Sequence, residues 1–148
     1  MLAAIQLNEY YISKINFEYD YQSEMPVEMK FGFNHDIKYI DNETVEVTID
    51  CSVRNDVGFN LNVKLHGLFD VTTTDEEDRD NDFDVRLKDL CEKNTLSILF
   101  PYLRSAISDI SLKANIDPII LPTINILSLV ENNKKRKESQ LELELELE

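Results

Sequence analysis

The stretch VEVTIDCSVRNDVGFNLNVKLHGLFDV, residues 45–71, determines the fold of this chain. Apolar and polar side chains alternate on both sides of Asn55-Asp56, and a period of two is typical of strands with one buried face. Asn and Asp favour tight turns, so the stretch predicts a β-hairpin with strands over residues 45–53 and 57–71. Gly67 interrupts the pattern of the second strand.

The same alternation extends upstream over residues 7–19 and 27–33. In the first segment one face carries every second residue from Leu7 to Tyr19, and the opposite face carries Tyr10 and Ile12. Polar breaks separate the segments, and one of these breaks, residues 35–42, contains His35. Four such strands predict an antiparallel sheet with one apolar and one polar face.

After residue 94 the apolar residues follow the period of a helix. Pro101 lies inside this helix and is expected to bend or divide it, because proline removes the hydrogen bond to the carbonyl of Ser97. The stripe predicted to face the sheet consists of Leu96, Leu99, Phe100, Leu103, Ile107, Ile110 and Ala114.

The bounds of the helical region follow from capping residues. Asn94 or Thr95 can cap the long helix, and Asp117-Pro118 ends it because the residue before a proline avoids helical dihedrals. A shorter helix is predicted over Asp84–Glu92, and one or two helical turns over Asn125–Asn132. The predicted fold class is therefore α+β, a four-stranded antiparallel sheet covered by a long C-terminal helix plus a short one.

The length of 148 residues predicts one domain, which we place at residues 1–131. Residues 75–82 are strongly acidic and are predicted to form a solvated connector. Residues 132–148 contain a basic cluster and a strict Leu-Glu alternation, and we expect this charged, low-complexity tail to lie outside the fold.

The net charge of −14 argues against binding to nucleic acid or to anionic membranes, because both require clustered cations. The amino-terminal residues do not have the pattern of a signal peptide, and no apolar stretch approaches the ~18 residues of a membrane span. Cys51 and Cys91 form no Cys-x-x-Cys pair and are interpreted as semi-buried thiols. These features predict a cytoplasmic protein without a disulfide framework.

The residues needed for catalysis do not converge in the sequence. His35 falls in a predicted turn and His66 on the polar face of the fourth strand, and both are interpreted as solvated side chains rather than as bases or ligands. The three glycines are too far apart for a phosphate-binding loop. The sequence therefore predicts a protein that is not an enzyme and has no cofactor or metal.

Aromatic and aliphatic residues exceed what one helix and one sheet face can bury. The excess is expected at Tyr10 and Ile12 on the first strand and at Ile98 and Tyr102 beside the helical stripe. Such residues meet either another subunit or a polypeptide ligand, and the pattern favours neither.

The run Ile98-Leu99-Phe100-Pro101-Tyr102-Leu103-Arg104, followed by Ile107 and by the apolar link 118–125, resembles the carboxy-terminal half of the SecB family of protein-export chaperones. Residues 5–18 resemble the first strand of this family, and residues 45–71 resemble its third and fourth strands. The resemblance covers residues 5–130. It implies a homotetramer built as a dimer of dimers, which holds unfolded polypeptides in a surface groove without ATP.

The resemblance also implies functional positions. The residues expected to line the polypeptide groove are Tyr19, Tyr21, Met25, Phe31 and Tyr102. Glu18 matches an acidic position through which the family's export member contacts the motor SecA. Lys14 and Asn62 stand where two further acidic residues would be, and Met25 lies near the position of a family tryptophan.

Two readings of the function follow from this resemblance. One is a general holdase that binds non-native polypeptides and serves protein export. The alternative is a SecB-like adaptor, or a chaperone dedicated to one antitoxin, with no delivery to SecA.

Overall fold

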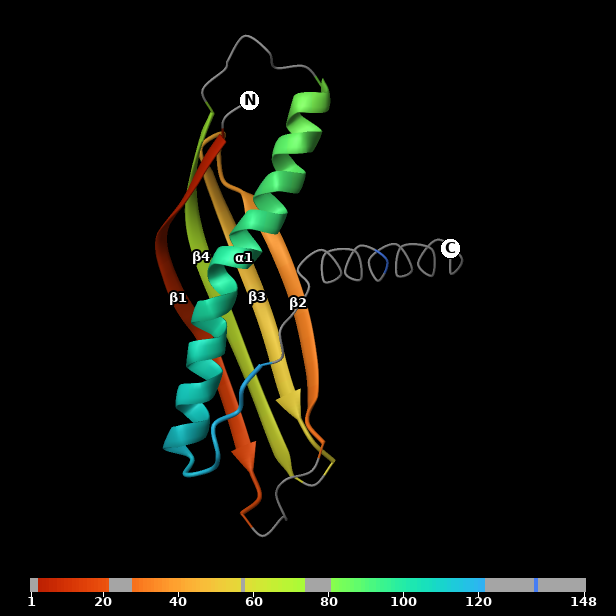
Figure 1. Cartoon of the computed structure of the whole chain (residues 1–148), viewed down its shortest axis with the longest axis vertical. Coiled ribbons are helices and arrows are strands. Elements are labelled where there is room, and N and C mark those ends of the chain that lie inside the picture. The colour runs from red at the N-terminus through yellow and green to blue at the C-terminus, as the bar shows by residue number, and fades with distance from the viewer. Residues whose placement is uncertain (1–2, 22–27, 57, 74–80, 122–134, 136–148) are drawn as a thin grey trace.

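The computed structural model describes residues 3–21, 28–56, 58–73, 81–121 and 135. In these residues the chain forms four strands and one helix: β1 (Ala3–Tyr19), β2 (Lys30–Tyr39), β3 (Thr44–Arg54), β4 (Phe59–Thr73) and α1 (Asn81–Lys113). The strands form one antiparallel sheet in the order β1-β4-β3-β2, so β1 and β2 are its two edges. Helix α1 crosses one face of this sheet at a slant (Figure 1). The four-stranded antiparallel sheet with a long helix on one face was correctly predicted.

The central hairpin of β3 and β4 is confirmed. The backbone N–H of Phe59 donates to Oδ1 of Asn55 at 3.0 Å, and the N–H of Asn55 donates to the carbonyl of Phe59 at 3.1 Å. Gly58 has a φ of 100°, a conformation that favours glycine. The apolar residues of both strands face α1 and are buried: Val45, Val47, Ile49, Cys51, Val53, Phe59, Leu61, Val63, Leu65, Phe69 and Val71.

Strand β1 differs from its prediction because it contains two β-bulges, between Leu7 and Glu9 and between Ile12 and Lys14. Each bulge inserts one residue without a partner on β4, so the side chains that follow change faces. Tyr10 and Ile12 therefore pair with Gly67 and Leu65 and face α1, whereas Tyr11 pairs with His66 on the opposite, outer face. The prediction that residues 7–19 share one uninterrupted alternation was wrong.

Strand β2 extends through the segment that was predicted to be a turn. His35 pairs with Ile49 in the middle of β2 and is buried against α1. Its Nε2 lies 2.8 Å from Oε1 of Glu92 on the helix, with 3% of the His35 side chain and 18% of the Glu92 side chain exposed. The turn assignment failed because histidine interrupts the apolar alternation of Phe31, Phe33, Ile37 and Tyr39.

The predicted short and long helices are one helix, so the separate helix over Asp84–Glu92 and the cap at Asn94 or Thr95 were wrong. Thr95 lies in the interior of α1, fully buried, and its hydroxyl donates to the carbonyl of Cys91. Pro101 lies inside α1 and is exposed, so its ring points away from the sheet and the helix continues past it. The hydrogen bond from Thr95 to the backbone of its own helix allows this polar residue to lie buried in the apolar stripe. The sequence pattern does not reveal such a bond.

The predicted apolar stripe is confirmed from Leu96 to Ile110 as the face of α1 that packs on the sheet, whereas Ala114 lies just beyond the end of the helix. Leu96, Leu99, Leu103 and Ile107 are fully buried, and the ring of Phe100 lies 6.0 Å from that of Phe33 on β2. The helix ends at Lys113, and Asn115 follows with a φ of 60°, a common helix C-terminal cap. Beyond it, Ile119 and Leu121 extend the buried core.

Several predicted features lie outside the described residues. These are most of the acidic connector, the turns over Asn125–Asn132, and the tail from residue 132 except Lys135.

The two cysteines are fully buried rather than semi-buried as predicted, since Cys51 is 0% and Cys91 1% exposed. Burial raises the pKa of both thiols, that of Cys51 to about 12 with a further contribution from Asp50.

Candidate functional site

An exposed apolar surface follows the edge strand β1 on the face that carries α1. We call Tyr10, Ile12, Ile15 and Tyr102 the edge surface. Their exposed fractions lie between 38% and 53%, which is high for large apolar residues that face a helix. The ring centroids of Tyr10 and Tyr102 lie 4.4 Å apart with a 38° tilt. Among the described residues β1 is an edge strand, so the edge surface joins this edge of the sheet to an aromatic residue of the helix.

The structure divides the residues expected in the polypeptide groove. Tyr19 and Phe31 are half-buried at one end of the sheet, where Tyr19 packs 5.9 Å from the ring of Phe59. Tyr21 is 87% exposed just beyond β1, whereas Tyr102 lies with Tyr10 on the edge surface. Met25 is outside the described residues. Tyr19 on β1 and Phe31 on β2 lie on opposite edge strands, and Tyr102 lies on the helix, so the structure does not bring the described members together.

The family motif on α1 serves mainly as core. Leu99, Phe100 and Ile107 are buried, and only Pro101 and Tyr102 are exposed. The guanidinium of Arg104 lies 5.6 Å from the centroid of the Phe100 ring, an arrangement in which the cation covers the aromatic face.

A pocket lies between the first turns of α1 and the end of the sheet that carries Tyr39. It has a volume of about 210 Å³, and its lining includes Tyr39, Val45, Leu87 and Cys91. The ammonium of Lys88 lies 5.6 Å from the centroid of the Tyr39 ring. Burial, with smaller contributions from Cys91 and Glu92, raises the pKa of Tyr39 to about 12.

The face of the sheet opposite α1 is polar and carries Glu18, Lys14 and Asn62. Lys14 pairs with Lys64, Glu18 with Asn60, and Asn16 with Asn62, so these positions project from two neighbouring strands. Nδ2 of Asn62 donates to Oδ1 of Asp50 at 2.9 Å. Of the three positions compared with the acidic contacts of the family, Glu18 is acidic, Lys14 is basic and Asn62 is neutral, and all three share this face.

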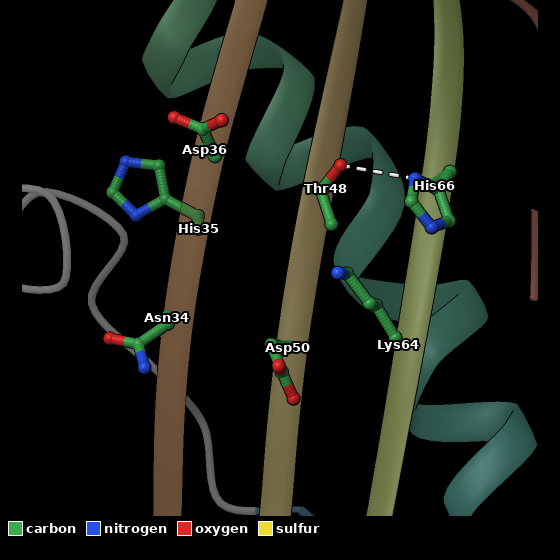
Figure 2. Close-up of a pocket in the computed structure, with 7 residues that line it drawn as sticks. All are labelled: Asn34, His35, Asp36, Thr48, Asp50, Lys64 and His66. Atoms are coloured by element: carbon green, nitrogen blue, oxygen red, sulfur yellow. Dashed lines mark hydrogen bonds between the residues drawn. The ribbon is translucent and has the colours of Figure 1, made fainter. Parts of the chain in front are cut away.

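A shallow hollow of about 250 Å³ lies on the same polar face (Figure 2). The side chains of Asn34, Asp36, Thr48, Asp50, Lys64 and His66 surround it, and His35 contributes from the edge. The interpretation of His66 as a solvated side chain was wrong: only 12% of its side chain is exposed, and it has polar neighbours on both adjacent strands, β1 and β3. The sequence pattern could not show this network, because its members come from three strands that are far apart in the sequence.

Within the described residues, no three His, Cys, Asp or Glu side chains come together as a metal-binding set. The same part of the chain has no helix that could cross a membrane.

Comparisons with known proteins agree with this architecture. The family described as "Preprotein translocase subunit SecB" matches residues 2–137. The protein MJ0357 of Methanocaldococcus jannaschii is 30% identical over 94% of this chain and 90% of its own length. The protein-export protein SecB of Burkholderia mallei is 37% identical over 84 residues, which are 57% of this chain and 48% of that protein. That match therefore spans about half of the Burkholderia protein.

A solved structure shares the fold. The SecB-like chaperone Rv1957 of Mycobacterium tuberculosis, in complex with a ChAD peptide from the antitoxin HigA1, superposes with a TM-score of 0.66 over 82% of this chain and 90% of that one, at 16% identity. At this identity the likeness establishes the fold and nothing finer. The family match over most of the chain, together with the sheet and the long helix, identifies this protein as a member of the SecB family of non-enzymatic chaperones.

Proposed function

We propose that this protein is an ATP-independent holdase of the cytoplasm that binds non-native polypeptides and keeps them from aggregating. The observation that carries this proposal is the edge surface, because Tyr10, Ile12, Ile15 and Tyr102 leave apolar area exposed beside a free strand edge. An extended polypeptide can contact such aromatic side chains and also hydrogen-bond to an unpaired strand. Neither contact depends on a particular client sequence.

The net charge of −14 supports this role. Like charges keep the chaperone and its complexes apart from one another, so exposed apolar area can be tolerated without self-association into aggregates. The same charge favours basic clients and disfavours acidic ones.

The test is the aggregation of a thermally unfolding client, followed by light scattering, with this protein in molar excess and no ATP. We expect scattering to be suppressed, and the suppression to be unchanged when ATP is added. Aggregation at the same rate as in buffer would exclude a general holdase.

A second candidate is a chaperone dedicated to one partner, such as an antitoxin. It is supported by the M. tuberculosis neighbour, which was solved with an antitoxin peptide. Binding of a single co-purifying polypeptide, together with no protection of unrelated clients, would favour this candidate over the general holdase.

We also propose that the chain assembles as a dimer of dimers and that residues 1–131 form its domain. The proposed groove residues remain Tyr19, Tyr21, Met25, Phe31 and Tyr102.

Glu18 is a proposed contact to SecA. Since Lys14 places a cation on the same face as Glu18, we expect SecA to bind more tightly to Lys14→Glu than to the unmodified chain. Equal affinity, or no binding by either, would argue against export delivery through this face.

A further inference from the structure

Ser13, His66 and Glu46 form a chain of polar contacts across three strands of the outer face. Oγ of Ser13 lies 2.6 Å from Nε2 of His66, and Nδ1 of His66 lies 3.3 Å from Oε1 of Glu46. A hydroxyl, an imidazole and a carboxylate in this order have the roles of a nucleophile, a base and the group that orients the base. Such constellations are recognised by geometry and roles rather than by fold.

Ser13 is the extra residue of the β-bulge between Ile12 and Lys14. In a regular strand Tyr11 and Ser13 would both face outward but Lys14 would not. The bulge leaves Ser13 without a partner on β4, beside His66, while Lys14 takes the next outward position opposite Lys64. Bulges often redirect a side chain next to a functional site.

The neighbours of His66 hold the position of its ring and favour one tautomer. The ring stacks on Tyr11 with centroids 4.6 Å apart and planes 7° from parallel. Nδ1 shares a hydrogen bond of 3.1 Å with Oγ1 of Thr48, and Oε1 of Glu46 lies 3.3 Å from the same nitrogen. A carboxylate is only an acceptor, so Glu46 favours the tautomer with the proton on Nδ1. In the neutral ring Nε2 is then an acceptor, which receives the hydroxyl hydrogen of Ser13.

The carboxylate is itself held in place. The hydroxyl of Tyr11 donates to Oε1 of Glu46 at 3.1 Å, so Tyr11 both stacks on the base and fixes the group that orients it. Burial, the hydrogen bond and the charge of Glu46 raise the pKa of Tyr11, so this hydroxyl remains a donor. The exposed fractions of the side chains are 12% for His66 and 22% for Glu46, whereas Ser13 is exposed to reagents.

Next to His66 the hollow of Figure 2 provides space for a reacting group. Its volume of about 250 Å³ exceeds what a small acyl group needs, and Lys64 supplies a cation for an anionic leaving group. His66 lines this hollow and contacts Ser13 of the neighbouring strand β1, so the hollow, the base and the hydroxyl share the face that does not carry the edge surface.

We propose that Ser13 is an activated nucleophile that accepts the acyl group of an activated ester once per chain. Oγ of Ser13 forms a bond to the acyl carbon, and the bond from that carbon to the leaving-group oxygen breaks, so the leaving group departs with its electron pair. His66 takes the hydroxyl proton at Nε2 and passes it to solvent. Glu46 is a positioning residue. The reaction is a stoichiometric modification without turnover, consistent with a non-enzymatic family.

The test uses the full chain and a fluorophosphonate probe, which reacts with activated serines by the same attack. Tryptic cleavage after Lys14 gives the peptide 1–14, in which Ser13 is the sole serine. We expect one adduct per chain on this peptide, and none in Ser13→Ala. Ser105→Ala, which removes an exposed serine of α1, is the matched control and should be labelled like the unmodified chain.

Variants of the base and the orienting residue separate a chemical role from a structural one. His66→Ala should lower the labelling rate by about a hundredfold, the usual contribution of a general base, and added imidazole should restore part of it. Glu46→Gln should lower the rate less. All variants should retain the melting temperature to within a few degrees.

Two results would overturn the proposal. One is labelling of Ser13 at an unchanged rate in His66→Ala. The other is an adduct on Tyr11 or spread over many serines, as found for hydroxyls that are merely exposed. An aryl ester such as p-nitrophenyl acetate gives the second arm: acetylation at Ser13 supports the site, and acetylation confined to Lys14 or Lys64 argues against it.

Discussion

The aromatic rings of Tyr10 on β1 and Tyr102 on α1 face each other with centroids 4.4 Å apart, although 49% and 39% of these residues are exposed. The contact joins the edge strand to the helix at the surface, where the core no longer covers either residue. It therefore combines a structural contact with an apolar area available to a client or to a second subunit.

We expect Tyr10→Ala and Tyr102→Ala to weaken the suppression of client aggregation while costing little stability. An aromatic pair contributes only about 0.5–1.5 kcal/mol beyond its burial, and both rings are half-exposed. Tyr11→Ala is the matched control, since its ring is 42% exposed but lies on the outer face. If Tyr11→Ala reduces suppression as much as Tyr102→Ala, the edge surface is not the client site.

Leu99→Asp and Ile107→Asp are expected to disrupt the domain and any assembly that depends on it. Both side chains are fully buried between α1 and the sheet, and an unpaired charge there costs several kcal/mol. Thermal unfolding and light scattering should both change. Ser105→Asp, on the exposed side of the same helix, should leave both measurements unchanged. An unaltered mass and melting curve in Ile107→Asp would contradict the packing described above.

Gly67 lies directly against the side chain of Leu99 on the helix. A Cβ at this position would lie 2.7 Å from Cδ2 of Leu99 and 2.9 Å from Cε2 of Phe69. We expect Gly67→Ala to lower the free energy of unfolding by about 1–3 kcal/mol, the usual effect of overpacking a core. Gly32→Ala is the comparison, because its Cβ would meet Oγ of Ser52, a small side chain that can rotate away. Equal losses in the two variants would argue against a tight contact at Gly67.

The His35–Glu92 contact connects β2 to α1 within the core. We expect His35→Leu to destabilise the fold by about 1–3 kcal/mol, because the carboxylate of Glu92 loses this donor while it remains largely buried. His35→Leu combined with Glu92→Leu should recover part of the loss, since two apolar residues leave no polar group unpaired. Additive effects in chemical denaturation would show that the two side chains are not coupled.

The free energy of unfolding should fall at alkaline pH, because burial raises the pKa of the Cys51 thiol from 9.0 to about 12 in the folded chain. The unfolded chain ionises first, so the stabilisation is complete below pH 9 and is lost as the pH rises from 9 toward 12. In Cys51→Ala the free energy of unfolding should fall less steeply over this range. Tyr39, with a pKa of about 12, contributes equally to both chains. Val53→Ala controls for the cavity, and should keep the steeper slope of the unmodified protein.

Local pattern predicted the regular parts of this fold well. The alternation over residues 45–71 and the stripe from Leu96 to Ile107 were confirmed, because burial on one side of a strand or helix requires a fixed spacing of apolar residues. The predicted division between a short helix over Asp84–Glu92 and a long helix capped at Asn94 or Thr95 was wrong, since Glu92 and Thr95 interrupt the apolar stripe without ending the helix. Both are satisfied by partners that the pattern cannot show: His35 on β2 for Glu92, and a helix carbonyl for Thr95.

The candidate sites were less predictable than the fold. The sequence placed Tyr10 and Tyr102 among surplus aromatic residues but gave no reason for them to meet. It placed His66 on the polar face, but treated it as solvated, because its contact with Ser13 spans 53 residues of sequence.

The sequence by itself determined the strands, the buried face of the helix and membership in the SecB family, because each depends on residue spacing or order along a short segment. Only the tertiary structure decided which side chains of β1 face the helix. Each bulge shifts the pairing with β4 by one residue, and a one-residue shift exchanges the two faces of a strand. The position of Tyr10 beside Tyr102 and of Ser13 beside His66 follows from that cross-strand register, which no single segment encodes.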